Sequence, residues 1–422
     1  MNSASRLDSF GGTSVPLVNA VTPVPLLDVS RQYQPLRTEI MAAVARVCDS
    51  GRFVLGPDCE QLELSLAEYC HAKYAIACAS GSDALLLALM AYDIGHGDEV
   101  LLPSYTFFAT AGAVWRTGAK AVFVDLEPTT YNIDPAQIES LITPATKAII
   151  PVHLYGQCAE MDEINRIGKK HNLAVIEDAA QAIGAEYHGQ RAGSLGDLGC
   201  ISFYPTKNLG GFGDGGALTT NNAQLADKLK LLRLHGMQPR YYHQLVGINS
   251  RLDTLQAAVL NVKLPHLDDW SDQREVNAKR YHALFAAAGL DQVLGLPATG
   301  AQRRHVWNQY IVRVPGGKRD PLREHLANLK IGTEIYYPVP LHLQECFKSL
   351  GYRPGSLPES ERAAAETIAL PIFPELTAAE QRAVVGAIGS FFRIKAVGNL
   401  GSLIPTARLM NHISSPSQGV AG

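Results

Sequence analysis

The sequence predicts an α/β protein with a large domain built on a mostly parallel sheet and a smaller C-terminal α+β domain. Between Tyr74 and Thr220, short apolar runs recur at the spacing of strands separated by helices or crossover loops. From about residue 252 onward the apolar residues take up helical spacing instead. A chain of 422 residues is also long enough to divide into two domains.

The strands of the large domain are expected at the runs AIACA, EVLLP, AVFVD, AIIPVHLY, LAVIED, CISFY and GALTT. Strands that alternate with helical segments indicate crossover connections, and these place helices on both faces of a parallel sheet. We therefore expect the large domain to cover residues 26–265.

The second domain is expected to begin among long helices. Two helical runs, LDTLQAAVLNVKL and VNAKRYHALFAAAG, are separated by Pro265. After them we expect a strand at VWNQYIVRV, a helix at PLREHLANLKI, a strand at TEIYYP and an amphipathic helix after Thr377. The small domain then covers residues 266–395, and the Ser-, Gly- and Pro-containing ends, residues 1–25 and 396–422, are expected to be a flexible extension and a flexible tail.

Composition argues against several classes of partner. A formal net charge of −3 leaves no basic surplus to neutralise nucleic-acid phosphates or anionic lipid, so we expect neither nucleic acid nor membrane as a partner. The seven cysteines are odd in number and form no C-x-x-C pair, which is typical of a reducing compartment. Since we find neither a signal-peptide pattern nor a long apolar span, we expect a cytoplasmic protein.

The segment SFYPTKNLGGFGDGG places Lys207 after a buried-looking strand and before glycines at positions 210, 211, 213, 215 and 216. We expect these glycines to give the backbone unusual freedom beside the lysine. A lysine near glycines is more often part of a surface turn than a nucleophile. The neighbouring motifs must therefore decide between the two interpretations.

The segment VIEDAAQAIGA is an apolar strand that ends on Glu177 and Asp178. The carboxyl edge of a parallel sheet is where α/β folds bind their ligands. Asp178 is therefore either an ordinary helix cap or the acid that pairs with the nitrogen of a pyridine ring.

Two further segments offer a phosphate site and an aromatic face. In CASGSDALLLALMA, the residues Gly81, Ser82 and Asp83 open a helical run, and the free N–H groups and dipole of a helix start favour a phosphate. The same residues would cap any helix. In LPSYTFFATAGAV, a strand runs into aromatic residues that either fill the core or present a flat face to an aromatic cofactor, namely Tyr105, Phe107 and Phe108.

Together these segments supply each contact that pyridoxal 5'-phosphate needs: a lysine, an acid for the ring nitrogen, an anion site and an aromatic face. We therefore expect this cofactor, and we expect no metal.

Five segments, GSDAL, YTFFAT, VIEDAAQAIGA, SFYPTKNLGGFGDGG and GINSRLDTLQAA, occur in an order and approximate spacing that resemble the DegT/DnrJ/StrS family of nucleotide-sugar aminotransferases. The later segments IYYPVPLHLQECFKSLGY and LPIFPEL resemble the C-terminal part of the same family, so the resemblance covers roughly residues 26–392. It implies the aspartate-aminotransferase-like fold of the fold type I pyridoxal enzymes.

The resemblance also implies a role for each site residue. Lys207 would form the Schiff base, Asp178 would bind the pyridine nitrogen, Gln181 would approach the phenolic oxygen and Phe107 would stack on the ring. The phosphate would be held by Gly81, Ser82, Asp83 and Ser202, although Ser82 and Asp83 stand where the family often has Thr and a small residue. Asn249 matches a phosphate contact from the neighbouring subunit, which implies a homodimer with shared active sites.

Three residues are expected at the substrate. Arg251 would meet an anionic group of the substrate from across the interface, but it suits an ordinary salt bridge equally well. Tyr337 and His342, in the YYPVPLHLQ segment, are the other expected substrate contacts.

The resemblance implies an aminotransferase that converts a nucleotide-linked keto sugar to an amino sugar, with a 3-keto sugar favoured and L-glutamate as donor. Such a reaction serves polysaccharide or secondary-metabolite biosynthesis. One alternative is a related sugar dehydratase, against which Lys207 argues because the dehydratases resemble this family but carry histidine there. Another is a regulatory protein that binds the cofactor without turnover, which would not require the lysine.

Overall fold

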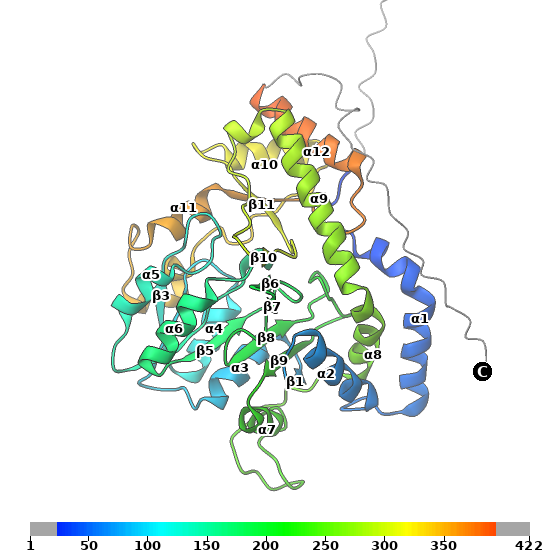
Figure 1. Ribbon diagram of the computed structural model, residues 1–422, viewed down its shortest axis with the longest axis vertical. Helices are drawn as coiled ribbons and strands as arrows, with labels where there is room; N and C mark the ends of the chain where they lie inside the picture. Colours follow the sequence, from blue (N-terminus) through cyan, green and yellow to red (C-terminus); the bar gives the residue numbers. More distant parts are fainter. Residues whose placement is uncertain (1–22, 394–422) are drawn as a thin grey trace, which may run out of the picture.

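The computed structural model describes residues 23–393, and its centre is a seven-stranded sheet of order β1-β9-β8-β5-β4-β2-β3 (Figure 1). All seven strands overlap the predicted apolar runs: β1 (Tyr74–Cys78), β2 (Glu99–Pro103), β3 (Lys120–Val124), β4 (Thr146–Ile149), β5 (Ala174–Asp178), β8 (Leu198–Ser202) and β9 (Gly216–Thr220). The run AIIPVHLY was predicted too long, since β4 ends at Ile149 and a 3-10 turn begins at Leu154. Only β9 runs antiparallel to its neighbours β1 and β8. The predicted α/β class with a mostly parallel sheet is therefore confirmed.

Helices cover both faces of this sheet, which explains why its strands are apolar almost throughout. Along β2, Val100 and Leu102 belong to one core cluster with residues of α3 (Gly81–Ala91), α4 (Ala109–Thr117) and α7 (Ala223–Leu232). Leu101, between them, packs with α6 (Met161–His171) on the other face. At the β1 edge of the sheet, α2 (Pro57–Tyr69) and α8 (Thr254–Lys263) share a further cluster, and α1 (Val29–Ser50) lies along α8.

A second group of elements follows the predicted break at Pro265, which lies in a 3-10 turn (Leu264–His266). The long helix α9 (Leu267–Ala287) leads from this turn to the antiparallel pair β11 (Tyr310–Arg313) and β12 (Thr367–Leu370). The remaining helices of this part are α10 (Arg319–Asn328), α11 (Pro358–Glu366) and α12 (Ala378–Phe392). As predicted, α12 follows Thr377, which caps it: the Thr377 hydroxyl and the Glu380 carboxylate each accept a hydrogen bond from the other residue's N–H.

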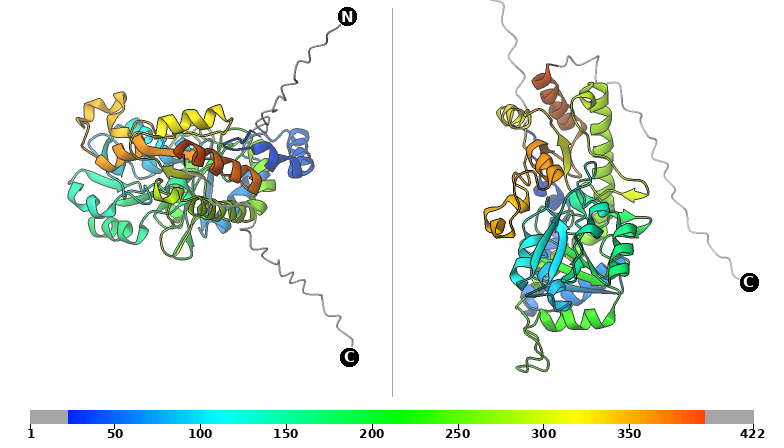
Figure 2. Two further views of the ribbon diagram at one scale, coloured as in Figure 1. Left: turned by 90° about the horizontal axis from the view of Figure 1, so that it is seen from above. Right: turned by 90° about the vertical axis from the view of Figure 1, so that its left-hand side faces the viewer.

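Small elements complete the described chain. A short helix α5 (Pro135–Ile138) follows β3, and a three-stranded sheet joins β6 (Glu186–Tyr187) and β7 (Gln190–Arg191) to β10 (Arg303–Arg304) of the second group. Between α7 and α8 a long loop, residues 233–253, extends below α7 in both side views (Figures 1 and 2). No helix between residues 23 and 393 combines the length and apolar character that a bilayer crossing requires.

Two predictions need correction. The strand expected at residues 333–338 is wrong, since within this range only Glu334 forms a bridge, to Ala369. Pro338 has no N–H to donate to a neighbouring strand, and the Tyr337 side chain bonds to Gln181, near the end of β5. Within the expected N-terminal extension, Val24 is buried and its N–H donates to Lys330 O at 3.1 Å, so order begins before residue 26. The other residues of the expected extension and tail, 1–22 and 396–422, lie outside the described chain.

Candidate active site

The carboxyl ends of β5 and β8 and the start of α3 meet in one cavity of about 490 Å³. The cavity has the size of an ordinary small-molecule site. Its floor comes from the main sheet, and three residues of the second group, Gln309, Tyr336 and Tyr337, complete its wall. Eight of the predicted site residues line it: Gly81, Ser82, Phe107, Asp178, Gln181, Ser202, Lys207 and Tyr337.

Asp178 is the last residue of β5, and its carboxylate lies at the floor of the cavity with 5% of the residue exposed. One oxygen accepts a hydrogen bond from Thr110 Oγ1 at 2.8 Å and the other from Ala180 N–H at 3.2 Å. Burial raises the pKa of Asp178, while these two donors and the Lys207 ammonium favour the ionised form. No helix begins after Asp178, so the alternative of a helix cap does not apply.

Lys207 lies in a turn after β8, where its backbone N–H donates to Tyr204 O at 2.8 Å. Burial lowers the pKa of its ammonium to about 8, and the negative charge of Asp178 partly opposes this effect. An amine with a pKa this close to neutrality can act as a nucleophile and as a proton acceptor.

The glycines after Lys207 do not provide the backbone freedom that we expected. All five have ordinary φ values. They are needed because neighbouring chain segments approach closely: a Cβ on Gly216 would lie 2.5 Å from Ser80 O, and one on Gly210 would lie 2.7 Å from the carbonyl carbon of Pro205. The loop is therefore closely packed, and Gly216 brings the lysine loop into contact with the start of α3.

The start of α3 forms an anion site. Ser80 caps the helix by accepting a hydrogen bond from Asp83 N–H at 3.1 Å, whereas the N–H groups of Gly81 and Ser82 have no partner in residues 23–393. A Cβ on Gly81 would lie 3.1 Å from Ser202 Oγ, so this hydroxyl lies beside the free amides. Asp83 does not line the cavity and its N–H is occupied, so its expected phosphate contact is not supported.

Gln181 is held in one orientation by two hydrogen bonds. Its Oε1 accepts from Tyr155 N–H at 2.7 Å, and its Nε2 donates to the Tyr337 hydroxyl at 3.0 Å. One hydrogen of Nε2 then remains for a ligand in the cavity. Tyr337 therefore acts on the site through Gln181 as well as through the cavity wall.

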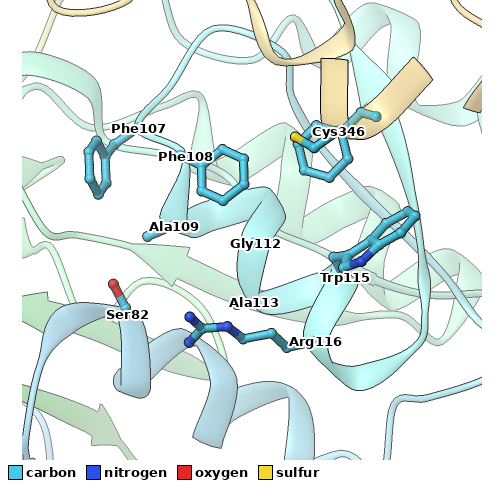
Figure 3. A pocket seen from close by; sticks show the side chains of 10 residues that line it. Ser82, Phe107, Phe108, Ala109, Gly112, Ala113, Trp115, Arg116 and Cys346 are labelled. Carbon is cyan, nitrogen blue, oxygen red and sulfur yellow. The ribbon is translucent and has the colours of Figure 1, made fainter. Parts of the chain in front are cut away.

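Phe107 is the predicted aromatic that lines the cavity, and 61% of it is exposed. It also borders an adjoining apolar hollow of about 300 Å³, where Figure 3 shows it at the same end as Ser82, with Trp115 at the far end. Phe108 lines only that hollow and stacks on Phe347 with ring centroids 5.5 Å apart. Tyr105 is buried in the core, so Phe107 alone of the three aromatics offers a face to the cavity.

The remaining predicted residues lie elsewhere. Asn249 and Arg251 line a separate polar hollow of about 520 Å³, which shares Ser80 and Asp214 with the cavity. His342 is 1% exposed, and its two ring nitrogens lie 2.6 Å from Ser104 Oγ and 3.1 Å from Glu361 Oε1. Because both nitrogens are engaged away from the cavity, the substrate contact expected for His342 does not fit this position.

Several cavity or supporting residues escaped the sequence analysis, among them Thr110, Tyr155, Gln309 and Tyr336. Thr110 was within the YTFFAT segment, but nothing in a sequence indicates that its hydroxyl reaches Asp178. Gln309 Oε1 is buried and has no hydrogen-bond partner in the described chain, so this wall of the cavity keeps a free acceptor for a bound molecule.

The model of the DegT/DnrJ/EryC1/StrS aminotransferase family matches residues 34–389. The chain belongs to this family. It is an aminotransferase that depends on pyridoxal 5'-phosphate. The cavity fits that cofactor, because an acid, a lysine and an oriented amide share it with a helix start that carries two free N–H groups.

Among curated proteins, the aminotransferase is 52% identical to a protein of Geobacillus stearothermophilus named pleiotropic regulatory protein, over 88% of this chain and 99% of the relative. It is 45% identical to dTDP-3-amino-3,4,6-trideoxy-alpha-D-glucose transaminase of Streptomyces venezuelae, over 87% of this chain and 96% of the relative. It is 41% identical to UDP-2-acetamido-2-deoxy-3-oxo-D-glucuronate aminotransferase of Pseudomonas aeruginosa, over 86% of this chain and 99% of the relative.

Among solved structures, the aminotransferase is similar to DesV of S. venezuelae in complex with a ketimine intermediate, with a TM-score of 0.84 and 44% identity over 87% of this chain and 98% of that one. It is also similar to NtdA of Bacillus subtilis with bound cofactor PMP, with a TM-score of 0.82 and 34% identity over 88% of this chain and 85% of that one. These similarities confirm the predicted fold type over the part of the chain that carries the cavity.

Proposed function

We propose that this aminotransferase moves an amino group from an amino-acid donor to the C3 keto carbon of a nucleotide-linked sugar. The observation that carries the proposal is the single cavity that unites Lys207, Asp178 and Gln181 with the anion site at the start of α3. The position of amination rests on relatives, since the S. venezuelae and P. aeruginosa enzymes differ in nucleotide but both have names that specify position 3 of the sugar.

Each residue of the cavity then has a task. Asp178 holds the pyridine nitrogen in its protonated form, Gln181 donates to the phenolic oxygen, and the amides of Gly81 and Ser82 with the Ser202 hydroxyl hold the phosphate. Bound pyridoxal phosphate supplies the electron sink for the carbon that loses its proton. Phe107 would offer its face to the ring.

Lys207 would hold the cofactor and, once released from it, would act as a base. Its amine, with a pKa lowered to about 8, would take the proton from the donor Cα and return it at the far end of the electron sink that the cofactor would supply. The same atom moves the proton in the opposite direction when the keto sugar is aminated. We propose L-glutamate as the donor.

A panel of acceptors tests the sugar. We expect the protein, loaded with cofactor and an excess of L-glutamate, to aminate UDP- or dTDP-linked 3-keto sugars at least about tenfold faster than dTDP-linked 4-keto deoxysugars, as measured by product chromatography. Faster turnover of a 4-keto sugar would contradict the position that we propose. Failure of glutamate alone to change the spectrum of the bound cofactor would contradict the donor.

We propose that the protein is a homodimer in which each of the two active sites takes residues from both copies of the chain. Asn249 and Arg251 lie outside their own chain's cavity, in an adjoining hollow, and Arg251 has no salt-bridge partner among residues 23–393. Both residues belong to the loop of residues 233–253, where Tyr241 and Val246 are 73% and 90% exposed. A second copy that covers this surface would receive Asn249 at its phosphate and Arg251 at the anionic part of its substrate.

Mixed dimers test this sharing. Lys207→Ala and Arg251→Ala are each expected to be nearly inactive at low substrate concentration. Dimers that combine one copy of each variant should regain one intact site, because that site takes Lys207 from one copy and Arg251 from the other. After random reassembly we expect about a quarter of wild-type activity. If the mixed dimers are as inactive as the two single variants, the sharing is contradicted, since Arg251 would then serve its own chain's cavity.

The contact between Tyr337 and Gln181 makes a further prediction. Tyr337→Phe should lower kcat about tenfold, because the Gln181 amide loses the acceptor that fixes its orientation. Tyr352→Phe is the matched control, since its hydroxyl accepts one hydrogen bond, from Phe123 N–H at 2.9 Å, outside the cavity. Steady-state kinetics check both variants. An unchanged kcat in Tyr337→Phe would show that Gln181 needs no such support.

A second candidate function is regulatory, and it is favoured by the name of the G. stearothermophilus relative. A protein that only binds the cofactor would not need an amine with a pKa lowered to about 8 beside an acid and an oriented amide. Turnover with any keto sugar of the panel would decide for the enzyme, and cofactor binding without turnover would favour the regulatory function.

We also propose that the protein works in the cytoplasm. Its seven cysteines, all of which the structure describes, are free thiols, and five of them are buried. Free cysteines are typical of a reducing compartment.

A further inference from the structure

We propose that Glu177 is a positioning residue for the cofactor and that His153 acts with it. Glu177 directly precedes Asp178 on β5, and successive side chains of a strand point to opposite faces. Asp178 faces the cavity, whereas Glu177 faces a turn at residues 191–197 on the other side. The proposal rests on the function proposed above for Asp178.

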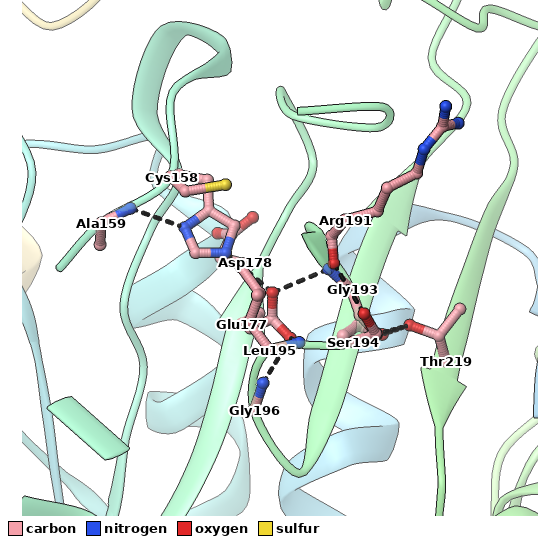
Figure 4. Close-up of polar contacts among 12 residues, drawn as sticks. Cys158, Ala159, Glu177, Asp178, Arg191, Gly193, Ser194, Leu195, Gly196 and Thr219 are labelled. Atoms are coloured by element: carbon pink, nitrogen blue, oxygen red, sulfur yellow. Dashed lines mark hydrogen bonds and ion pairs between the residues drawn. The ribbon is translucent and has the colours of Figure 1, made fainter. Parts of the chain in front are cut away.

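Glu177 is fully buried, and both its oxygens are saturated with hydrogen bonds. Oε1 accepts from Leu195 N–H at 2.8 Å and from Gly196 N–H at 2.7 Å. Oε2 accepts from Gly193 N–H at 2.7 Å (Figure 4). It also lies 2.9 Å from His153 Nε2. A carboxylate offers about four acceptor positions, and donors fill all four. Glu177 is therefore placed to act as an ionised carboxylate.

His153 connects the two neighbouring acids. Its Nδ1 accepts a hydrogen bond from Ala159 N–H at 3.1 Å, which leaves the hydrogen on Nε2 for Glu177. Its backbone N–H donates to Asp178 O at 3.0 Å. One buried histidine thus contacts the side chain of Glu177 and the main chain of Asp178.

The turn that Glu177 holds is packed against the strands that carry the site. Thr219 Oγ1, on β9, donates to Gly193 O at 2.5 Å, and a Cβ on Gly196 would lie 2.7 Å from Val175 O on β5. Gly193 has a φ of +93°, which favours glycine. Without the carboxylate, three amides of this turn, one buried and two partly buried, would lose their acceptor, and an amide without a partner away from water is costly. The end of β5, and with it Asp178, would then lose its support on this face.

Glu177 also adds a negative charge on the far side of the strand from Asp178. Charges in a poorly polarisable interior act over several ångströms. A second negative charge near Asp178 favours binding of one proton by the pair that Asp178 would form with the ring nitrogen. Removal of the Glu177 charge is expected to weaken the binding of the cofactor, although Glu177 does not line the cavity.

The test compares Glu177→Gln and His153→Phe with a matched control, Asp125→Asn. Asp125 is also a buried carboxylate that accepts from two backbone N–H groups, of Glu359 and Ser360, but it follows β3 at the far edge of the sheet and does not line the cavity. Pyridoxal phosphate is titrated into each apoprotein, and the bound cofactor is followed by visible circular dichroism, which requires that the ring be held in one orientation.

We expect Glu177→Gln to raise the Kd for pyridoxal phosphate about tenfold or more and to reduce the visible dichroism per bound cofactor, with a smaller effect of His153→Phe in the same direction. Asp125→Asn should lower Tm and leave both readouts unchanged. If Glu177→Gln only lowers Tm as the control does, the proposal is overturned; if it does not fold, His153→Phe decides by the same criterion. If Asp178→Asn also changes neither readout, the function proposed for Asp178 fails instead.

Discussion

Lys207→Ala is expected to lower kcat at least about 10⁴-fold, because one side chain provides both the attachment of the cofactor and the base that moves the proton. The variant should still bind pyridoxal phosphate through Asp178 and the start of α3. Its visible absorbance band should be displaced to that of the free aldehyde, since no lysine is attached. In wild type the band should disappear when L-glutamate is added, and in the variant it should persist.

The chain provides a matched control in Lys263. Burial lowers the pKa of this lysine to about 8 as well, and its ammonium donates to Gly210 O, but it does not line the cavity. Lys263→Met should therefore lose stability and keep both the band and its response to glutamate. Displacement of the band in both variants, or in neither, would contradict the assignment of Lys207.

Asp178→Asn is expected to have the second largest effect, a fall in kcat of about 10³-fold. This is the rate loss expected from the free energy lost when one member of a buried charge pair is removed. The amide keeps the shape of the carboxylate and can still bond to Thr110, but it cannot hold the ring nitrogen in its charged form. The electron sink is then weaker at each proton transfer. Single-turnover rates with L-glutamate measure this directly.

The same exchange at Asp125 is the control for Asp178→Asn, because it neutralises a buried acid outside the cavity. Its single-turnover rate should remain within about threefold of wild type. A similar small effect in Asp178→Asn would mean that another group holds the ring nitrogen.

The sheet and its carboxyl edge could be predicted from the sequence for a simple reason. Strands buried on both faces are apolar throughout, so their limits are visible as runs such as LAVIED, and the polar residues that end them must lie at the edge. Asp178, Lys207 and the start of α3 were found in this way, since each is adjacent in sequence to a strand.

Contacts between distant parts of the chain could not be predicted. Gln181 and Tyr337 are 156 residues apart, and their hydrogen bond depends on how the second group of elements packs on the sheet. His342 belonged to a recognised segment, but its ring bonds to Ser104 and Glu361, which no pattern indicated. The prediction for the glycines after Lys207 was also wrong, because a sequence does not distinguish a glycine needed for a positive φ from one needed where two chain segments approach closely.

The division of the cavity between floor and wall has a practical consequence for redesign. The groups assigned to the cofactor lie on the main sheet and the start of α3, whereas Gln309, Tyr336 and Tyr337 come from a stretch more than 90 residues farther along the chain than Lys207. The groups assigned to the cofactor and these three wall residues thus lie on different stretches of the chain. Grafting residues 305–340 from a relative with another sugar offers a route to a retargeted enzyme that keeps its reaction, provided that Tyr337 is retained to orient Gln181.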